Sequence, residues 1–201
     1  MAYESLDARG EGAARWEEAG RPTIPSLVLA GRLLPILHVS QLAKALGFAA
    51  PAPPPSALRA WQTVGRLQEW LARLRPLDRA TLTRPTPARG RSLVNLTINV
   101  FHPFELLPRA WESGRFDWDP TRDDERERAL ASPEAVVAYA EGIQRAWGDF
   151  VARREDELER RDLVVDSPRG ELTYSELLES QSWHVEFHTR QLTEFLAAHP
   201  T

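Results

Sequence analysis

The 201-residue chain contains no cysteine and only one methionine. The lack of cysteine excludes disulfide bonds, a thiolate metal site and a cysteine nucleophile. No apolar run approaches the roughly 18 residues that a membrane-spanning helix needs, and residues 1–20, MAYESLDARGEGAARWEEAG, are polar and acidic, unlike a secretion signal. We therefore expect a cytoplasmic protein that does not use a membrane as a partner.

The chain also lacks a stripe of like charge. Its net charge is −4, and its many arginines are interleaved with acidic residues, as in RDDERERA and ARREDELERRD. This pattern is typical of solvated helix faces and loops rather than of a phosphate-binding surface. No nucleic-acid partner is expected, and 42% hydrophobic residues suit an ordinary folded core.

The N-terminal quarter contains little that predicts a large core. We expect residues 1–21 to be poorly ordered. Residues 22–50 predict a small appendage, in which SLVLAG and LLPILHV form two strands around a turn at Gly31-Arg32 and a short helix follows. Residues 51–56 are rich in proline, which indicates a stiff, extended linker.

Residues 57–199 carry four helical patterns of apolar residues. The second pattern is apolar nearly all round, which predicts burial on several sides. A charged connection at 112–131 separates it from the third. The predicted N-terminal caps are Ser56, Ser92, Ser132 followed by Pro133, and Thr173 in a capping box with Glu176. The fold class is therefore mainly α, a four-helix bundle with a long crossover between its second and third helices.

The stretch SWHVEFHTRQL places His184 and His188 one turn apart on the fourth helix. Both fall within the apolar stripe of that helix, so we expect them to face the interior. Buried imidazoles need partners. A divalent metal would satisfy both, because i and i+4 histidines can converge on one ion. Hydrogen bonds to Gln181, Gln191 or water are the alternative.

A metal site needs at least one more ligand, and the second helix offers candidates. Asn95, Asn99 and His102 are polar residues in an otherwise apolar segment. His102 could complete a three-histidine site with positions left open for water or substrate. Pro103 removes a backbone donor and is expected to kink the helix there.

These residues resemble the DinB/YfiT-like superfamily of metal-binding four-helix bundles, whose fourth helix reads roughly H-x-x-H-H-R-G-Q-L. His184, His188, Gln191 and Leu192 match that signature, whereas the three positions FTR, at 187, 189 and 190, depart from it. A subgroup that reads W-H-x-x-x-H-x-R-Q-L is more similar, and its bundle follows a glutaredoxin-like piece. IPSLVLAGRLLPILHVSQLAKALG is similar to the end of such a piece, so the likeness covers about residues 55–198, and more weakly 22–48.

The resemblance implies a divalent metal held by one histidine on the second helix and the pair on the fourth. Asn99 occupies the usual histidine position, and His102 is displaced from it by three residues. Three outcomes stay open. His102 takes over through the kink at Pro103, Asn99 provides an oxygen ligand, or the site has been lost.

The resemblance further implies thiol chemistry, either transfer of mycothiol, bacillithiol or glutathione to a small organic electrophile or thiol-dependent isomerisation. Zinc suits the ligands, and nickel or iron would also bind imidazole. A small-molecule substrate is expected, and a homodimer is a further possibility. Candidate substrate contacts are Asn99, Trp183, Arg190 and Gln191, with Phe101, Phe104 and Phe187 as further wall residues.

Two other functions remain open. The same metal could activate water for hydrolysis, with Glu105 or Glu186 as the catalytic carboxylate. Alternatively, the chain is a non-catalytic bundle that binds a small ligand and has a decayed metal site. Dependence of activity on added thiol would separate the transferase from the hydrolase.

Overall fold

The computed structural model describes residues 11–19, 26–35, 39–49, 54–86, 90–119, 122–160, 162–168 and 170–199. Within these ranges the chain is mainly helical, with two small antiparallel sheets of two strands each. It divides into two compact units, Met1–Pro53 and Pro54–Thr201. None of the helices in the described ranges is both long and apolar enough to cross a membrane.

Among its described residues, the first unit holds two short helices and one strand pair. Its elements are α1 (Ala13–Glu18), β1 (Ser26–Leu29), β2 (Arg32–Pro35) and α2 (Val39–Leu46). The strands pair antiparallel, from Ser26 opposite Pro35 to Leu29 opposite Arg32.

Two details of this unit differ from the sequence-based expectation. The turn falls on Ala30 and Gly31, with φ of 49° and 76°, one residue earlier than predicted. Positive φ at both central residues is what a two-residue hairpin turn of type I′ requires. In addition, α1 lies within residues 1–21, where no regular structure was expected. Residues 51–53 of the predicted linker lie outside the described residues.

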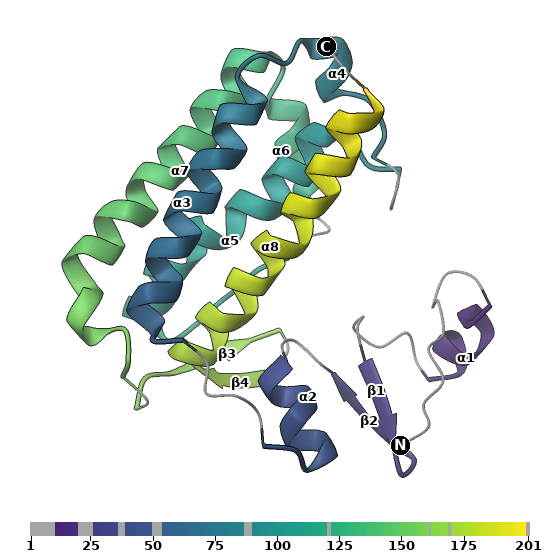
Figure 1. The fold of residues 1–201 in the computed structure, drawn as a ribbon, viewed down its shortest axis with the longest axis vertical. Helices are drawn as coiled ribbons and strands as arrows, with labels where there is room; N and C mark the ends of the chain where they lie inside the picture. Colours follow the sequence, from purple (N-terminus) through teal and green to yellow (C-terminus); the bar gives the residue numbers. More distant parts are fainter. Residues whose placement is uncertain are drawn as a thin grey trace. The chain divides into compact units, whose positions relative to one another are not determined.

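The second unit contains the remaining elements (Figure 1). They are α3 (Ser56–Leu74), α4 (Arg79–Leu82), α5 (Leu93–Ser113), α6 (Asp123–Ala129), α7 (Pro133–Arg154), the 3₁₀ helix η2 (Glu155–Glu157), β3 (Val164–Ser167), β4 (Gly170–Thr173) and α8 (Tyr174–Ala198).

Capping residues explain where most of these helices begin. Three predicted caps are confirmed, namely Ser92, Ser132, and Thr173 in a capping box with Glu176. The prediction for Ser56 is wrong, because Pro55 is the N-cap of α3 and no side chain caps that end. Ser56 is instead buried inside the first turn, where its Oγ lies 2.7 Å from Oγ of Ser175 on α8.

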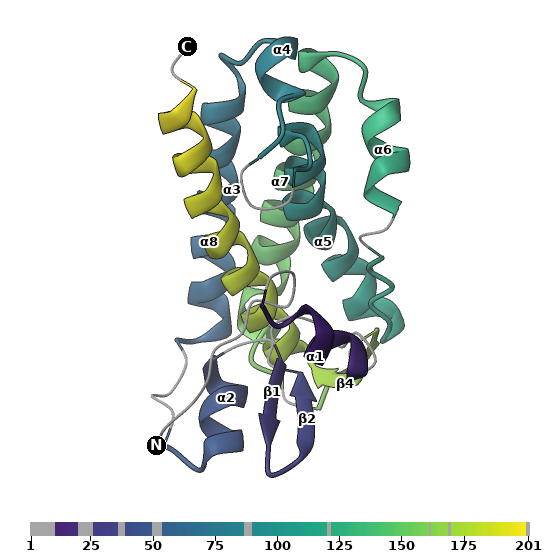
Figure 2. The ribbon, with the colours of Figure 1, turned by 90° about the vertical axis from the view of Figure 1, so that its right-hand side faces the viewer.

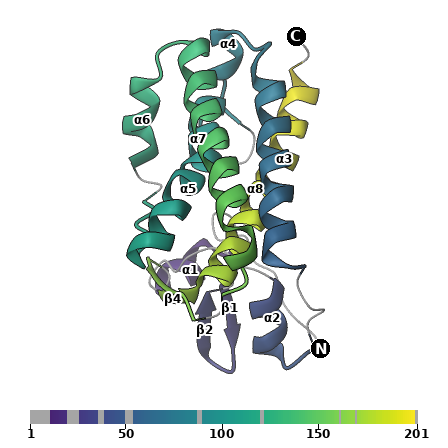
Figure 3. The same cartoon turned by 90° about the vertical axis from the view of Figure 1, so that its left-hand side faces the viewer.

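The four long helices α3, α5, α7 and α8 pack side by side, as Figures 1, 2 and 3 show from three directions. α3 and α8 run parallel to each other, and α5 and α7 run antiparallel to them. The contacts that establish these directions are Arg59–Ser175 and Arg73–Thr193 for α3 and α8, Val64–Gly148 and Arg75–Glu141 for α3 and α7, and Asn99–His184 and Leu107–Tyr174 for α5 and α8.

α5 is the central helix of this unit. Every residue from Leu93 to Phe104 is buried, which confirms the expected burial on several sides. The helix continues through Pro103 and Pro108. Two of its aromatic residues, Phe104 and Trp111, join a cluster with Trp147 and Phe150 of α7 and Tyr174 of α8.

The connection from α5 to α7 is anchored at both ends. Gly114, in the left-handed region at φ 68°, ends α5. Phe116 N then donates to the carbonyl of Asp166 on β3, and Asp166 N donates to the carbonyl of Gly114, both at 2.8 Å. Further on, α6 lies along α5 through three side-chain hydrogen bonds, Ser92 to Glu127, Asn95 to Asp124 and Asn99 to Asp123.

Candidate metal centre

The two histidines of α8 lie next to each other. Their ring centroids are 4.5 Å apart and the ring planes are nearly perpendicular, at 86°. His188 is buried, at 5% exposure, and His184 is half-buried. The Trp118 ring, from the connection after α5, packs edge-on against His184 with centroids 5.1 Å apart.

Asn99 on α5 is the side chain that meets His184. Its Oδ1 lies 3.3 Å from His184 Nε2, while its Nδ2 donates to Asp123 Oδ2 at 3.1 Å. The carboxylate can only accept in this bond, so it orients the Asn99 amide with the nitrogen toward α6 and the oxygen toward His184. In this hydrogen bond Nε2 of His184 is the donor, so its proton would have to move to Nδ1 before Nε2 could bind an ion.

Two polar groups approach Nδ1 of His188. Gln191 Oε1 lies at 2.7 Å and Arg91 Nη2 at 3.5 Å. They require opposite roles, because the Gln191 oxygen accepts and a guanidinium only donates. The shorter contact decides, so Nδ1 donates to Gln191. In the neutral ring, Nε2 of His188 then carries the lone pair, which is the arrangement that metal-bound histidines use.

Asp123 is a carboxylate enclosed beside this group. It is 1% exposed, and burial raises its pKa, while the hydrogen bond from Asn99 and the charges of Arg126 and Arg91 act in the opposite direction. Its Oδ1 accepts no hydrogen bond within the described chain and lies 4.0 Å from Arg126 Nη1. Asp123 thus places a buried carboxyl group one hydrogen bond away from Asn99.

His102 is not brought to the histidine pair. It is 3% exposed, and its Nε2 lies 4.0 Å from Glu105 Oε2. Among the residues that the structure describes, no three His, Cys, Asp or Glu side chains are placed to share an ion. The predicted set of His102, His184 and His188 is therefore not assembled, because the helical turn of α5 that faces α8 presents Asn99.

His102 should be visible in the pH dependence of folding. Burial, with the charges of Arg126, Arg109 and Arg122, lowers its pKa from 6.5 to about 4. Between pH 6.5 and about 4 the unfolded state binds more protons than the native state, so the free energy of unfolding decreases as the pH is lowered through this range. Between pH 7 and 5 we expect the parent to lose about 2 kcal/mol more than His102→Gln in urea unfolding. Identical pH profiles for the two proteins would contradict this.

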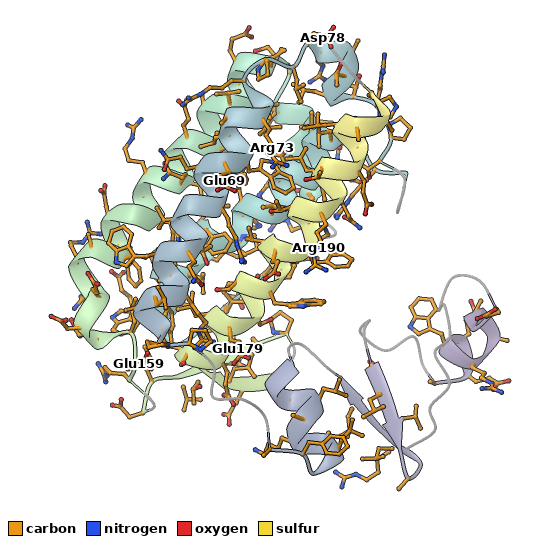
Figure 4. All side chains as sticks on the ribbon, viewed as in Figure 1. Glu69, Arg73, Asp78, Glu159, Glu179 and Arg190 are labelled. Atoms are coloured by element: carbon orange, nitrogen blue, oxygen red, sulfur yellow. The ribbon has the colours of Figure 1, made fainter. Side chains whose placement is uncertain are left out.

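The predicted catalytic carboxylates are engaged elsewhere. Glu105 Oε1 accepts from Arg109 at 2.9 Å. Glu186 accepts from Arg66 and Arg190, each at 3.1 Å. Arg190, whose side chain is 73% exposed, extends from the outer face of α8 (Figure 4). Both glutamates are thus paired with arginines, and Arg190 forms the ordinary ion pair of neighbouring helical turns.

The predicted aromatic wall divides into two groups. Phe101 and Phe104 are fully buried core residues. Trp183 and Phe187 are exposed, at 38% and 42%, and stack on each other with centroids 5.5 Å apart. Phe187 also touches the edge of His188 at 5.1 Å. The aromatic ring against His184 is Trp118, which sequence reasoning did not select.

Sequence reasoning also missed Asp123 and Arg91. Asp123 lies in the run RDDERERA, which was interpreted as a solvated face. Asn95 and Asn99 carried the available signal, because amides on a helix buried all round must have polar partners. Both partners turn out to be aspartates of α6.

Compared with models of protein families, with curated proteins and with solved structures, the chain has no significant match.

Proposed function

We propose that this chain is a metal-binding four-helix bundle of the DinB/YfiT-like type, with His184, His188 and Asn99 as its ligands. In this proposal it transfers a small thiol to an organic electrophile, or isomerises a substrate with the help of that thiol. The approach of Asn99 Oδ1 to His184 Nε2, at 3.3 Å, is the observation that carries the proposal. Two ligands about 2.1 Å from one ion at a tetrahedral angle lie about 3.4 Å apart.

The order of the helices supports the bundle. α3 and α8 run in one direction, and α5 and α7 run in the other. The connection from α5 to α7 therefore joins parallel helices, whereas the connection from α7 to α8 joins antiparallel helices. α7 returns to α8 through the β3–β4 hairpin. α5 and α7 are parallel neighbours and need a crossover, which residues 114–132 with α6 provide. A crossover between the second and third long helices is what the resemblance implies.

The surroundings of the three residues suit ligands. Gln191 holds the His188 ring through Nδ1, and Asp123 holds the Asn99 amide through Nδ2. Such second contacts fix the orientation of metal ligands and are usual around bound ions. Two imidazoles and an amide oxygen suit Zn²⁺, and Ni²⁺ or Fe²⁺ would also accept them.

A bound divalent ion would lower the pKa of a coordinating thiol and so supply a thiolate at neutral pH. The chain has no cysteine, so that thiol comes from a cosubstrate. In an addition to an activated double bond, sulfur bonds to one carbon and the thiol proton goes to the other, so nothing else is consumed. Trp118 shields the His184 side of the centre from water.

A second candidate is a non-catalytic bundle that binds a small ligand. The same hydrogen bond favours it, because Asn99 Oδ1 satisfies His184 Nε2 without an ion. An amide oxygen is also a weaker zinc ligand than imidazole. Hydrolysis has less support, since Glu105 and Glu186 are paired with arginines.

Metal content of the purified, untagged protein tests the proposal first. We expect about one Zn, Ni or Fe per chain by mass spectrometry. The protein is then reloaded with Co²⁺ and titrated with 2-mercaptoethanol. Binding of sulfur to the metal should produce a near-ultraviolet charge-transfer band. If the protein takes up no metal, even after reconstitution, the non-catalytic ligand-binding bundle is the remaining candidate function. If it takes up metal but shows no charge-transfer band with the thiol, thiol chemistry is excluded.

A further inference from the structure

α6 covers a polar face of α5. Ser92, Asn95, Asn99 and His102 recur every three or four residues, so they share one side of that helix. The last three are buried. Three acidic residues of α6 accept hydrogen bonds from the first three. Figures 2 and 3 show α6 at the edge of the bundle, outside α5. The contact between the two helices is therefore polar on both sides.

α6 itself has no apolar face. Its sequence is DDERERA, Ala129 is exposed, and Asp123 is its only buried residue. A helix of seven residues is not stable by itself in water. Since it buries no apolar side chain, its hydrogen bonds to α5 hold it in place, and water can replace each of them when α6 moves away. Separating α6 from α5 is therefore easier than separating the long helices, which bury apolar side chains.

Some polar atoms next to α6 are not satisfied while it lies on α5. Within the described chain, His102 Nδ1, Asp123 Oδ1 and the Tyr139 hydroxyl are buried without a hydrogen-bond partner. Burial lowers the pKa of His102 and raises that of Tyr139, and the charge of Arg126 on α6 acts on both. Both side chains thus lie within electrostatic reach of α6. Unpaired buried polar atoms are costly, so access of water to them favours an open state.

The chain on either side of α6 is anchored by contacts that do not involve α5. Before α6, Phe116 N donates to the carbonyl of Asp166 on β3 at 2.8 Å. After it, the Leu130 carbonyl accepts from Arg79 of α4 at 3.0 Å, and Ser132 caps α7. These contacts can stay in place when the bonds between α5 and α6 break.

We propose that α6 is a lid that leaves α5 without unfolding of the four long helices and exposes Asn99 and His102 to solvent. Asp123 moves with the lid, so opening releases the Asn99 amide and closure fixes its orientation again. The opening is the entrance through which an ion reaches the Asn99 side of the candidate centre. The entrance rests on the proposed function, whereas the movement of the lid does not.

Modification of His102 by diethyl pyrocarbonate measures the opening, because this ring is 3% exposed while α6 is in place. The reaction is followed on the purified protein by mass spectrometry of its peptides. Asp124→Ala removes the acceptor of Asn95 and should speed the modification of His102 about 10-fold, as loss of one charge-assisted hydrogen bond allows. The matched control is Glu125→Ala, an acid of the same turn that pairs with Arg122, and it should keep the parent rate.

Hydrogen exchange of the α7 amides reports global unfolding in the same samples. The lid is overturned if His102 of the parent reacts no faster than global unfolding allows, or if Asp124→Ala speeds α7 exchange to the same extent. It is also overturned if Glu125→Ala acts like Asp124→Ala. If Asp124→Ala is misfolded by circular dichroism, Glu127→Ala, which removes the acceptor of Ser92, takes its place.

The entrance is tested by the rate of Co²⁺ uptake, followed by visible absorption. Uptake should be about 10-fold faster in Asp124→Ala than in the parent, at unchanged affinity, because the same bond limits opening. Equal rates would overturn entry from the α6 side and leave the lid standing. If the parent binds no Co²⁺, the entrance fails together with the proposed function, and the modification of His102 alone decides whether α6 is a lid.

Discussion

His184→Ala is expected to leave the protein without bound metal, whereas His102→Ala should bind metal as the parent does. Asn99→Ala should weaken metal binding by at least about 10–100-fold, which is the usual loss when even a partner of a ligand is removed. The physical reason is the geometry around α5. Asn99 Oδ1 lies 3.3 Å from His184 Nε2, while His102 lies beside Glu105.

Asn95→Ala is the matched control for Asn99→Ala. Asn95 is an amide one turn earlier on α5, 7% exposed, and donates to Asp124 at 2.8 Å. Asn95→Ala therefore removes a comparable hydrogen bond between α5 and α6 and leaves the contact of α5 with His184 on α8 in place. Metal affinity is measured by competition with a chromophoric chelator. If His102→Ala loses the metal and Asn99→Ala retains it, the third ligand is His102 and not Asn99.

The largest effect on stability is expected at the buried ion pair between α3 and α8. Arg59 is 6% exposed, and its Nη1 lies 3.3 Å from Glu179 Oε2. Glu179 is labelled near the start of α8 in Figure 4. Glu179→Ala leaves the buried guanidinium with only the hydroxyls of Ser56 and Ser175 as acceptors on these helices. We expect a loss of about 3–5 kcal/mol in the free energy of unfolding.

The matched control is Glu141→Ala, which breaks the ion pair with Arg75 between α3 and α7. Those side chains are 34% and 61% exposed, so the loss should stay below about 1 kcal/mol. Both variants are compared with the parent by urea unfolding at pH 7. Similar losses at the two positions would show that the Arg59 pair is as well solvated as a surface pair.

Much of the secondary structure could be predicted because its signals are local. Ser92, Ser132 and Thr173 with Glu176 mark helix starts through contacts of three residues or fewer along the chain. The β3–β4 hairpin was missed although its signal was present in VVDSPRGELT. Its strands have only four residues each and follow a charged run, so their alternation is short.

The candidate centre was predictable on α8 and not beyond it. His184 and His188 share a face because they are four residues apart in one helix, and Gln191 reaches His188 from three residues away. Asp123 and Arg91 could not be inferred in the same way. Each joins the group through packing between elements that are distant in sequence, and a charged side chain in a polar run gives no sign that it is buried.

The sequence by itself determined that any metal site lacks thiolate ligands, that any reacting thiol comes from outside, and that one helix presents two adjacent imidazoles. Only the tertiary structure decided which residue of α5 meets them. Asn99 and His102 lie three residues apart on a helix that is buried all round, so neither burial nor periodicity separates them. The packing of α5 between α8 and α6 places Asn99 between His184 and Asp123, and thereby selects the amide.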